Sequence, residues 1–232
     1  MSGGTKELVI RTISGIVFVA LMVVAILYSA PLFVILFSII LLGCLWEFFK
    51  LRGSDKNFPL TILFSLYILP AFILSFFILK YFGPKVLLSL FIIMWAGDVG
   101  AYCIGTLFGQ GPHGHKLAPK ISPKKSWEGV IGGMLFAIAA AFVLKRAGWF
   151  NCFTIEGSQT GTIAAYVLFA IIFYAAAICG DLLESVLKRR AGVKDSGHIM
   201  PGHGGFLDRF DSFLTAIPVA YVLIELANIF IK

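Results

Sequence analysis

Acidic residues in the last third of the chain occur as pairs at helical spacing. Asp181 and Glu184 are three residues apart, as are Asp208 and Asp211, so each pair shares one face of a helix. Two such faces at one depth would gather four carboxylates, whose repulsion requires a divalent cation or several basic groups. Oxygen ligands alone favour Mg²⁺ or a similar hard ion over zinc. The pattern predicts a metal site, and the alternative is a set of structural salt bridges with Lys188 and Arg209.

A glycine-containing segment, PGHGGFLDRFD, runs from residue 201 to 211 and leads into a predicted helix. The N–H groups and dipole at a helix start favour an anion. Asp208 and Asp211, in the first turns, could hold a metal bound to that anion. Lys194 and Asp195 come shortly before the segment and strengthen the interpretation. Phosphate together with Mg²⁺ is the natural ligand for such an arrangement.

A second polar loop, GPHGHKLAPKISPKKSWEGVIGG, covers residues 111–133. Its pattern predicts a helix with Ser122 as the N-cap and Pro123 at the first helical position. Lys124 and Lys125 would then lie just inside the helix, where they could bind phosphate. Lysines at a cytoplasmic helix end also satisfy the positive-inside rule alone, and for this loop taken singly that explanation is favoured.

The elements that must position these residues are membrane helices. The sequence is 59% hydrophobic and 13% charged, whereas soluble domains average about 25% charged. Backbone groups in lipid must be satisfied internally, so we expect an all-α, polytopic integral membrane protein. We expect one integrated membrane domain with two parts, which are N-terminal helices (1–90) and a C-terminal catalytic region (91–232). About seven transmembrane helices are predicted, at residues 12–28, 31–49, 59–79, 85–108, 124–144, 161–187 and 206–230.

The basic residues predict the orientation of these helices. With the N-terminus inside, most of the 19 Lys and Arg residues fall in inner segments. The +7 net charge therefore reports topology and gives no reason to expect nucleic acid. The two longest polar loops, 109–123 and 188–205, both fall on the cytoplasmic side, and Asp98 falls in the inner half of its span. A polar, metal-bearing cavity opening to the cytoplasm follows.

These residues carry a resemblance to a known family. In order and spacing, the C-terminal positions resemble the signature of the phosphatidate cytidylyltransferase (CDP-diacylglycerol synthase) family. The stretches DVGAYCIGTLFG (98–109) and SPKKSWEG (122–129) are similar to the family's upstream blocks, so the resemblance covers about residues 95–212. Ser126 stands where the family usually has Thr, and Met200 where it has Leu, Ile or Phe. The matching signature positions are Ser185, Lys188, Arg189, Lys194, Asp195, Pro201, His203, Gly204, Gly205, Asp208, Arg209 and Asp211.

The resemblance implies a Mg²⁺-dependent reaction of CTP with phosphatidic acid that yields CDP-diacylglycerol and pyrophosphate. It also implies a homodimer. The distribution of basic residues places the active site on the cytoplasmic side, and the short, loop-poor chain suits a bacterial inner membrane. A second, monovalent cation is a further option. Asp181 and Asp208 are the first candidates for metal ligands, and Asp211 and Asp195 come second. The other catalytic candidates are Lys194, Asp195 and Arg209; those for binding substrate are Lys188, Arg189, His203, Gly204, Gly205, Ser122, Lys124, Lys125, Asp98 and Tyr102.

Three other functions compete with this one. A CTP-dependent enzyme acting on another lipid phosphate would have the same nucleotide chemistry. An ion-coupled transporter would use intramembrane acids such as Asp98 and Asp181, but it would need them exposed to both sides in turn. A CDP-alcohol phosphatidyltransferase is disfavoured because the chain has no DGxxAR-type stretch.

Glu47, late in the second span, fits the polar interior and the membrane interface equally well.

Overall fold

The protein is described by a computed structural model that covers residues 3–52, 58–111, 114–197, 199 and 204–231. Helices dominate these residues, as the apolar composition predicts, and one short β-hairpin joins them. The elements are α1 (Gly3–Tyr28), α2 (Ala30–Arg52), α3 (Phe58–Phe82), α4 (Pro84–Phe108), β1 (Lys116–Ala118), β2 (Ser122–Ser126), α5 (Trp127–Arg146), α6 (Gln159–Arg190) and α7 (Leu207–Phe230).

Helices α2, α4, α5, α6 and α7 are long and apolar enough to cross a membrane. Helices α1 and α3 contribute shorter apolar stretches among the described residues, Thr12–Tyr28 and Tyr67–Phe82. Many large apolar side chains on these helices are exposed, which is expected where lipid is the surrounding solvent. The prediction of an all-helical, multi-pass membrane protein is confirmed, while the count of seven membrane crossings and the division at residue 90 stay predictions.

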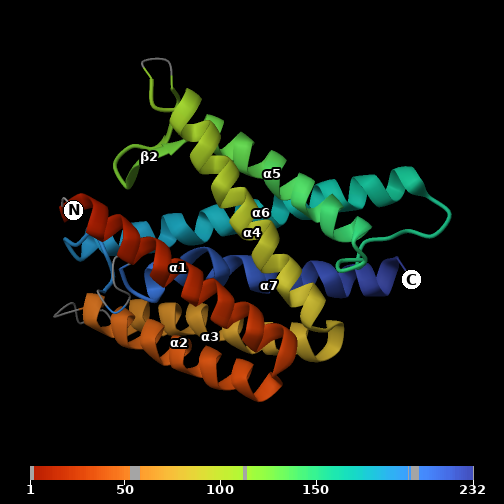
Figure 1. Ribbon diagram of the computed structural model, residues 1–232, viewed down its shortest axis with the longest axis horizontal. Helices are drawn as coiled ribbons and strands as arrows, with labels where there is room; N and C mark the ends of the chain where they lie inside the picture. Colours follow the sequence, from red (N-terminus) through yellow and green to blue (C-terminus); the bar gives the residue numbers. More distant parts are fainter. Residues whose placement is uncertain (1–2, 53–57, 112–113, 198, 200–203, 232) are drawn as a thin grey trace.

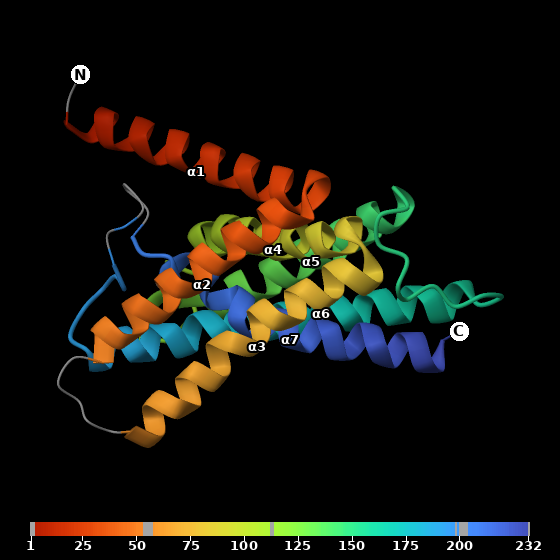
Figure 2. The same ribbon diagram turned by 90° about the horizontal axis from the view of Figure 1, so that it is seen from below.

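The helices form a bundle whose polar connections gather at one end. Figure 1 shows α4 running obliquely across α6 and α7, with α5 on one side of this crossing and α2 and α3 on the other. The β-hairpin, the end of α6 and the start of α7 lie at the end where α1 begins (Figure 1). The C-terminus lies at the opposite end (Figure 1 and Figure 2). The two longest polar loops therefore share one end of the bundle.

An aromatic cluster fixes the rotation of α7. Phe210 and Phe213 have ring centroids 5.2 Å apart and both contact Phe37 of α2 and Phe72 of α3. Phe91 of α4 stacks on Phe213 at 5.5 Å. Burial of these rings supplies apolar area and favourable edge-to-face contacts. Asp211 lies between these two phenylalanines in the sequence, and Asp208 lies two residues before Phe210. The cluster therefore also determines where these two carboxylates point.

The start of the fifth helix differs from the prediction. Ser122 and Pro123 lie in strand β2, which pairs antiparallel with β1, and the helix begins at Trp127. Ser126 is the N-cap, because its Oγ accepts a hydrogen bond from Gly129 N at 3.2 Å. The assignment of Ser122 as N-cap was wrong, since Ser-Pro also suits an extended strand and pairing with residues 116–118 stabilises that form.

Candidate active site

A pocket of about 560 Å³ opens between α4, α5, α6 and the β-hairpin, within the range of roughly 300–1,000 Å³ that ligand sites occupy. Its walls are mostly apolar, and its polar groups come from all of these elements and from the start of α7. The predicted residues that line it are Asp98, Tyr102, Lys124, Lys125 and Asp181, and they are joined by Gln110, Ser126, Tyr174 and Ser212.

Two carboxylates line this pocket, and a third lies close to them. Asp98 on α4, Asp181 on α6 and Asp211 on α7 are close enough that each interacts electrostatically with the other two. Lys125 Nζ lies 2.6 Å from Asp181 Oδ2 and partly compensates the negative charge. Tyr174 OH donates a hydrogen bond to Asp98 Oδ1 at 3.4 Å. The sequence prediction that acids from distant spans converge on one place therefore holds for these residues.

The close crossing of α6 and α7 brings Asp181 and Asp211 together. A Cβ on Gly180 would overlap the backbone carbonyl of Asp211 and the Thr215 side chain. Thr215 Oγ1 donates to Ala176 O at 2.6 Å, which ties the two helices at this level. A glycine is needed here because any side chain would separate the helices that carry the two carboxylates.

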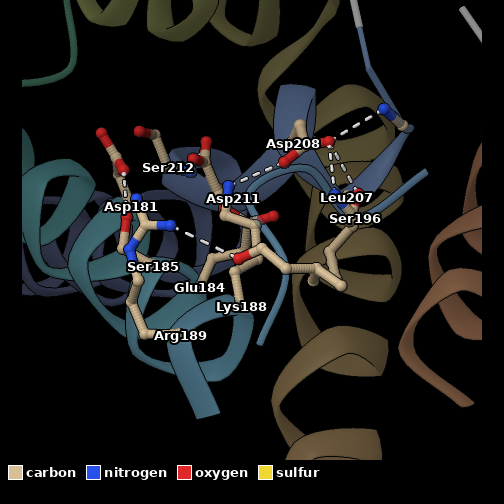
Figure 3. A network of polar contacts seen from close by, with 12 residues as sticks. Asp181, Glu184, Ser185, Lys188, Arg189, Ser196, Leu207, Asp208, Asp211 and Ser212 are labelled. Atoms are coloured by element: carbon tan, nitrogen blue, oxygen red, sulfur yellow. Dashed lines mark hydrogen bonds and ion pairs between the residues drawn. The ribbon is translucent and has the colours of Figure 1, made fainter. Parts of the chain in front are cut away.

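Lys188 holds a second, more buried group of acids. Its Nζ forms ion pairs with Glu184, four residues earlier on α6, and with Asp208 Oδ1 at 2.7 Å (Figure 3). The Glu184 side chain is only 2% exposed, so its charge depends on this partner. The salt-bridge alternative considered from the sequence is thus realised for Glu184 and Asp208. Contact of Lys188 with a substrate phosphate stays a prediction.

Asp208 has both of its carboxylate oxygens bonded to the protein. Oδ1 faces Lys188, and Oδ2 accepts hydrogen bonds from Ser196 N, Ser196 Oγ and Gly205 N, each at 2.9 Å (Figure 3). Gly204 has a φ of 82°, a left-handed conformation that suits glycine, and turns the chain into this contact. The structure therefore gives Asp208 an architectural role at the start of α7.

The N-terminus of α7 does not offer its N–H groups to a ligand. Phe206 N donates to Glu47 Oε1 at 3.1 Å, and Leu207 N donates to Glu47 Oε2 at 2.9 Å. Gly205 N is already bonded to Asp208. The expectation that this helix start binds a phosphate was wrong in this respect, because two carboxyl groups of the chain itself occupy the anion site. Contact of Gly204 and Gly205 with substrate stays a prediction.

The remaining predicted residues lie at the edge of the site or outside it. Arg189 is exposed, and its Nε donates to Ile121 O at 3.2 Å, which ties α6 to the hairpin. Lys194, Asp195 and Arg209 are also exposed, and none of them is among the described residues that line the pocket. His203 lies outside the described residues, and its predicted role stays a prediction.

The donors around the pocket fit a hard cation only in part. Among the described residues, no three His, Cys, Asp or Glu side chains stand together as a ready metal-binding group. Both carboxylate oxygens of Asp208 are already bonded to groups of the protein. Asp181 and Asp211, in contrast, point to the same side, with Ser212 between them (Figure 3). Carboxylate and hydroxyl oxygens are what Mg²⁺ prefers. Asp181 and Asp211 therefore suit the predicted metal better than Asp208 does.

Two groups of supporting residues had no recognisable signal in the sequence. Glu47 and Ser196 gather the start of α7, although Glu47 lies 160 residues before Leu207. Beside the hairpin, Glu128 at the start of α5 accepts from His115 N at 3.0 Å and lies 2.8 Å from His115 Nδ1. The only hint for these residues was an ionisable side chain beside a membrane span, since a charge there needs a partner.

Comparison with known proteins agrees with this arrangement. The sequence profile of the cytidylyltransferase family matches residues 55–227. The phosphatidate cytidylyltransferase of Rickettsia felis is 37% identical over 218 residues, which are 94% of this chain and 92% of that protein. The protein of the same name from Haemophilus influenzae is 46% identical over 138 residues, 60% of this chain and 45% of that protein. The chain thus spans about half the length of the Haemophilus relative.

The fold and the site define a class: a multi-pass helical membrane protein with a carboxylate-lined and lysine-lined pocket at one end of its bundle. Within that class, the chain belongs to the cytidylyltransferase family.

Proposed function

We propose that this protein is a phosphatidate cytidylyltransferase that converts CTP and phosphatidic acid into CDP-diacylglycerol and pyrophosphate. A phosphate oxygen of the lipid attacks the α-phosphorus of CTP, and the bond to the bridging oxygen of pyrophosphate breaks. The attacking oxygen is already ionised near neutral pH, so the site needs no strong general base. Positioning and charge neutralisation carry most of the catalysis, as in phosphoryl transfer generally.

The observation that carries this proposal is the pairing of Lys124 and Lys125 with Asp98 and Asp181 around one pocket in a member of this family. The lysines come from the hairpin, and the carboxylates come from membrane helices. Lysines suit phosphate oxygens, and carboxylates suit a cation that accompanies a triphosphate. A pocket with both groups matches a substrate that is itself a metal–nucleotide complex.

Different residues of the chain have different roles in the proposed reaction. Lys125, bound to Asp181 at 2.6 Å, is the candidate to contact a phosphate of CTP, and Lys124 lies beside it on β2. Tyr102 and the apolar walls of α4 and α5 would accommodate the glycerol and upper acyl region of the lipid. Glu184, Lys188 and Asp208 keep α6 and α7 in register.

We extend the proposal to a Mg²⁺ ion held by Asp181 and Asp211, with Asp98 and Ser212 nearby. When bound, such an ion would neutralise the triphosphate and stabilise the leaving pyrophosphate. Among the described residues, the donor chemistry supports this choice, although Lys125 shares Asp181 and would have to yield or share that carboxylate. A monovalent ion is a further option that the donor set leaves open.

The proposed location is the inner membrane of a bacterium, with the pocket facing the cytoplasm. Two observations support it: the two polar loops lie at one end of the bundle (Figure 1), and the relatives named above are bacterial. Phosphatidic acid presents its head group at the membrane surface, and CTP arrives from the cytosol. A site at that boundary reaches both substrates, and a homodimer is part of the same proposal.

The test is CTP-dependent turnover of phosphatidic acid by the detergent-purified protein, with and without Mg²⁺, following pyrophosphate and CDP-lipid together. Equal amounts of both products, dependent on Mg²⁺ and strongly reduced in Asp181→Asn at the Mg²⁺ concentration that saturates wild type, support the proposal. Glu225→Gln, the same chemical change near the far end of α7, is the control. If folded protein yields neither product from phosphatidic acid or another lipid phosphate, the proposal is wrong, and ion uptake into vesicles becomes the assay for the transporter alternative.

A further inference from the structure

Glu47 is a fully buried acid for which the proposed reaction has no direct use. It lies near the end of α2, outside the segment matched by the family profile, and its residue exposure is 0%. Both carboxyl oxygens accept hydrogen bonds. Phe206 N donates at 3.1 Å and Leu207 N at 2.9 Å, and Ser196 Oγ lies 3.0 Å away with its one proton shared between Glu47 and Asp208. A buried carboxyl group with these partners has a structural role.

The surroundings of Glu47 are shaped to receive it. A Cβ on Gly197 or on Gly205 would overlap its carboxyl group, so the chain on either side of the loop approaches as closely as a glycine permits. One helical turn earlier on α2, Gly43 makes room for the ring of Phe206 in the same way. Helix α2 therefore docks on the beginning of α7 through two positions on one face.

Ser196 links Glu47 to the acids of the site. Its Oγ lies 3.0 Å from Glu47 Oε2 and 2.9 Å from Asp208 Oδ2, and its backbone N–H also donates to Asp208. Asp208 in turn faces Lys188 on α6. A continuous chain of hydrogen bonds thus runs from α2 through the loop and α7 to α6, and Asp211 lies one turn beyond Asp208.

We propose that Glu47 is a positioning residue that sets where α7 begins and thereby where Asp208 and Asp211 stand relative to Asp181. The inference rests on the proposed cytidylyltransferase function. Glu47 touches neither substrate; it acts by replacing the anion that a helix N-terminus would otherwise attract from solution. Without its carboxyl group, the N–H groups of Phe206 and Leu207 lose their acceptor and the first turn of α7 loosens.

The experiment compares full-length wild type with Glu47→Gln, Glu47→Asp, Ser196→Ala and the control Glu225→Gln, all in detergent with CTP, phosphatidic acid and Mg²⁺. Glu47→Gln should lower kcat per folded molecule by on the order of 10- to 100-fold, since displacing catalytic groups by about 1 Å has such effects. KM for CTP should change little, because no substrate contact is removed. Glu47→Asp, which keeps the charge, should recover part of the loss.

Hydrogen exchange gives a second readout that does not depend on turnover. Amides in residues 205–208 should exchange faster in Glu47→Gln than in wild type, while amides late in α7 stay protected. Unchanged kcat together with unchanged protection overturns the inference while leaving the proposed function intact.

Two further outcomes are informative. If wild type and Glu225→Gln make no CDP-lipid, the proposed function fails and takes the catalytic part of the inference with it. If Glu47→Gln yields no folded protein, Ser196→Ala decides: a fall in kcat at unchanged KM supports the inference, and full activity with full protection of residues 205–208 overturns it.

Discussion

Lys125 Nζ lies 2.6 Å from Asp181 Oδ2, so a β-hairpin outside the helices is tied directly to a carboxylate of a membrane span. The contact joins the hairpin of the first polar loop to α6, the helix that leads into the second polar loop. It also places a positive charge at the pocket wall, where the proposed function needs a partner for CTP phosphates.

Removing that charge should weaken CTP binding. Lys125→Ala is expected to lower kcat/KM for CTP by about 10- to 100-fold, because a charge-assisted hydrogen bond contributes roughly 1.5–3 kcal/mol. Steady-state kinetics with varied CTP measure the effect. Lys120→Ala, an exposed lysine in the turn of the same hairpin, is the control and should behave as wild type. An equal loss in both variants would mean that only the overall charge of the hairpin matters.

Titration with Mg²⁺ can show which of the acidic residues bind the metal. EDTA should abolish turnover, and Mg²⁺ should restore it. Asp181→Asn and Asp211→Asn should raise the half-saturating Mg²⁺ concentration by on the order of tenfold or more, since each removes a charged oxygen ligand. Asp208→Asn should instead lower the apparent melting temperature with little change in that concentration, because its oxygens are bonded to the protein. A rise in the half-saturating Mg²⁺ concentration in Asp208→Asn alone would show instead that Asp208 is a metal ligand.

The helix crossing at Gly180 should not tolerate a side chain. Gly180→Ala places a methyl group against the Asp211 carbonyl and the Thr215 hydroxyl, and overpacking of this kind costs about 1–3 kcal/mol. We expect a lower apparent melting temperature and reduced turnover, since Asp181 and Asp211 move apart. Gly111→Ala, where an added Cβ meets open space, serves as the matched control. Wild-type behaviour of Gly180→Ala would show that the helices can separate without harm to the site.

Lys188 should be coupled to Glu184. Lys188→Met leaves Glu184 buried without its cation, and breaking a buried pair on one side costs about 3–5 kcal/mol. Adding Glu184→Gln should recover part of this loss, because the uncompensated charge is removed. A double-mutant cycle on thermal unfolding measures the coupling. Strictly additive effects would contradict an energetic link between the two side chains.

The start of α5 can be tested with two serines. Ser126→Ala removes the N-cap of α5 and should cost about 1 kcal/mol, whereas Ser122→Ala, in strand β2, should be nearly neutral. Comparison of the two melting temperatures checks this. The reverse order would favour the helix start at residues 122–123 that the sequence alone suggested.

Apolar length was sufficient to predict the helices, because a bilayer forces each long apolar segment to satisfy its own backbone. The residues 31–49 and 85–108 expected as spans lie within α2 and α4. The hairpin was missed because Ser-Pro is compatible with a helix start and with a strand, and the deciding partner strand lies in the same loop. In such a segment, pairing with a partner strand decides between helix and strand, and the segment's own residues do not show this.

The site was predicted where its signal was local. The spacing within the acidic pairs pointed to Asp181 and Asp211, and the polar loop pointed to Lys124 and Lys125. Asp181 and both lysines line one pocket, and Asp211 lies close to Asp181. Sequence could not distinguish a metal ligand from a helix-capping acid, so Asp208 was assigned to the metal. Glu47 was left undecided because its donors at Phe206 and Leu207 lie about 160 positions away, and no local pattern encodes such a contact.

The contact between α2 and α7 has a consequence for biosynthesis. Glu47 enters the membrane with the second helix, yet its backbone donors at Phe206 and Leu207 reach it only when the last helix arrives. Until then, the apolar side chains of α2 alone must keep it in the membrane, although Glu47 still lacks these donors. Helix α2 is the most apolar of the candidate spans. A chain truncated before Phe206 would thus contain every span but one and still leave the Glu47 carboxyl group without both of its backbone donors.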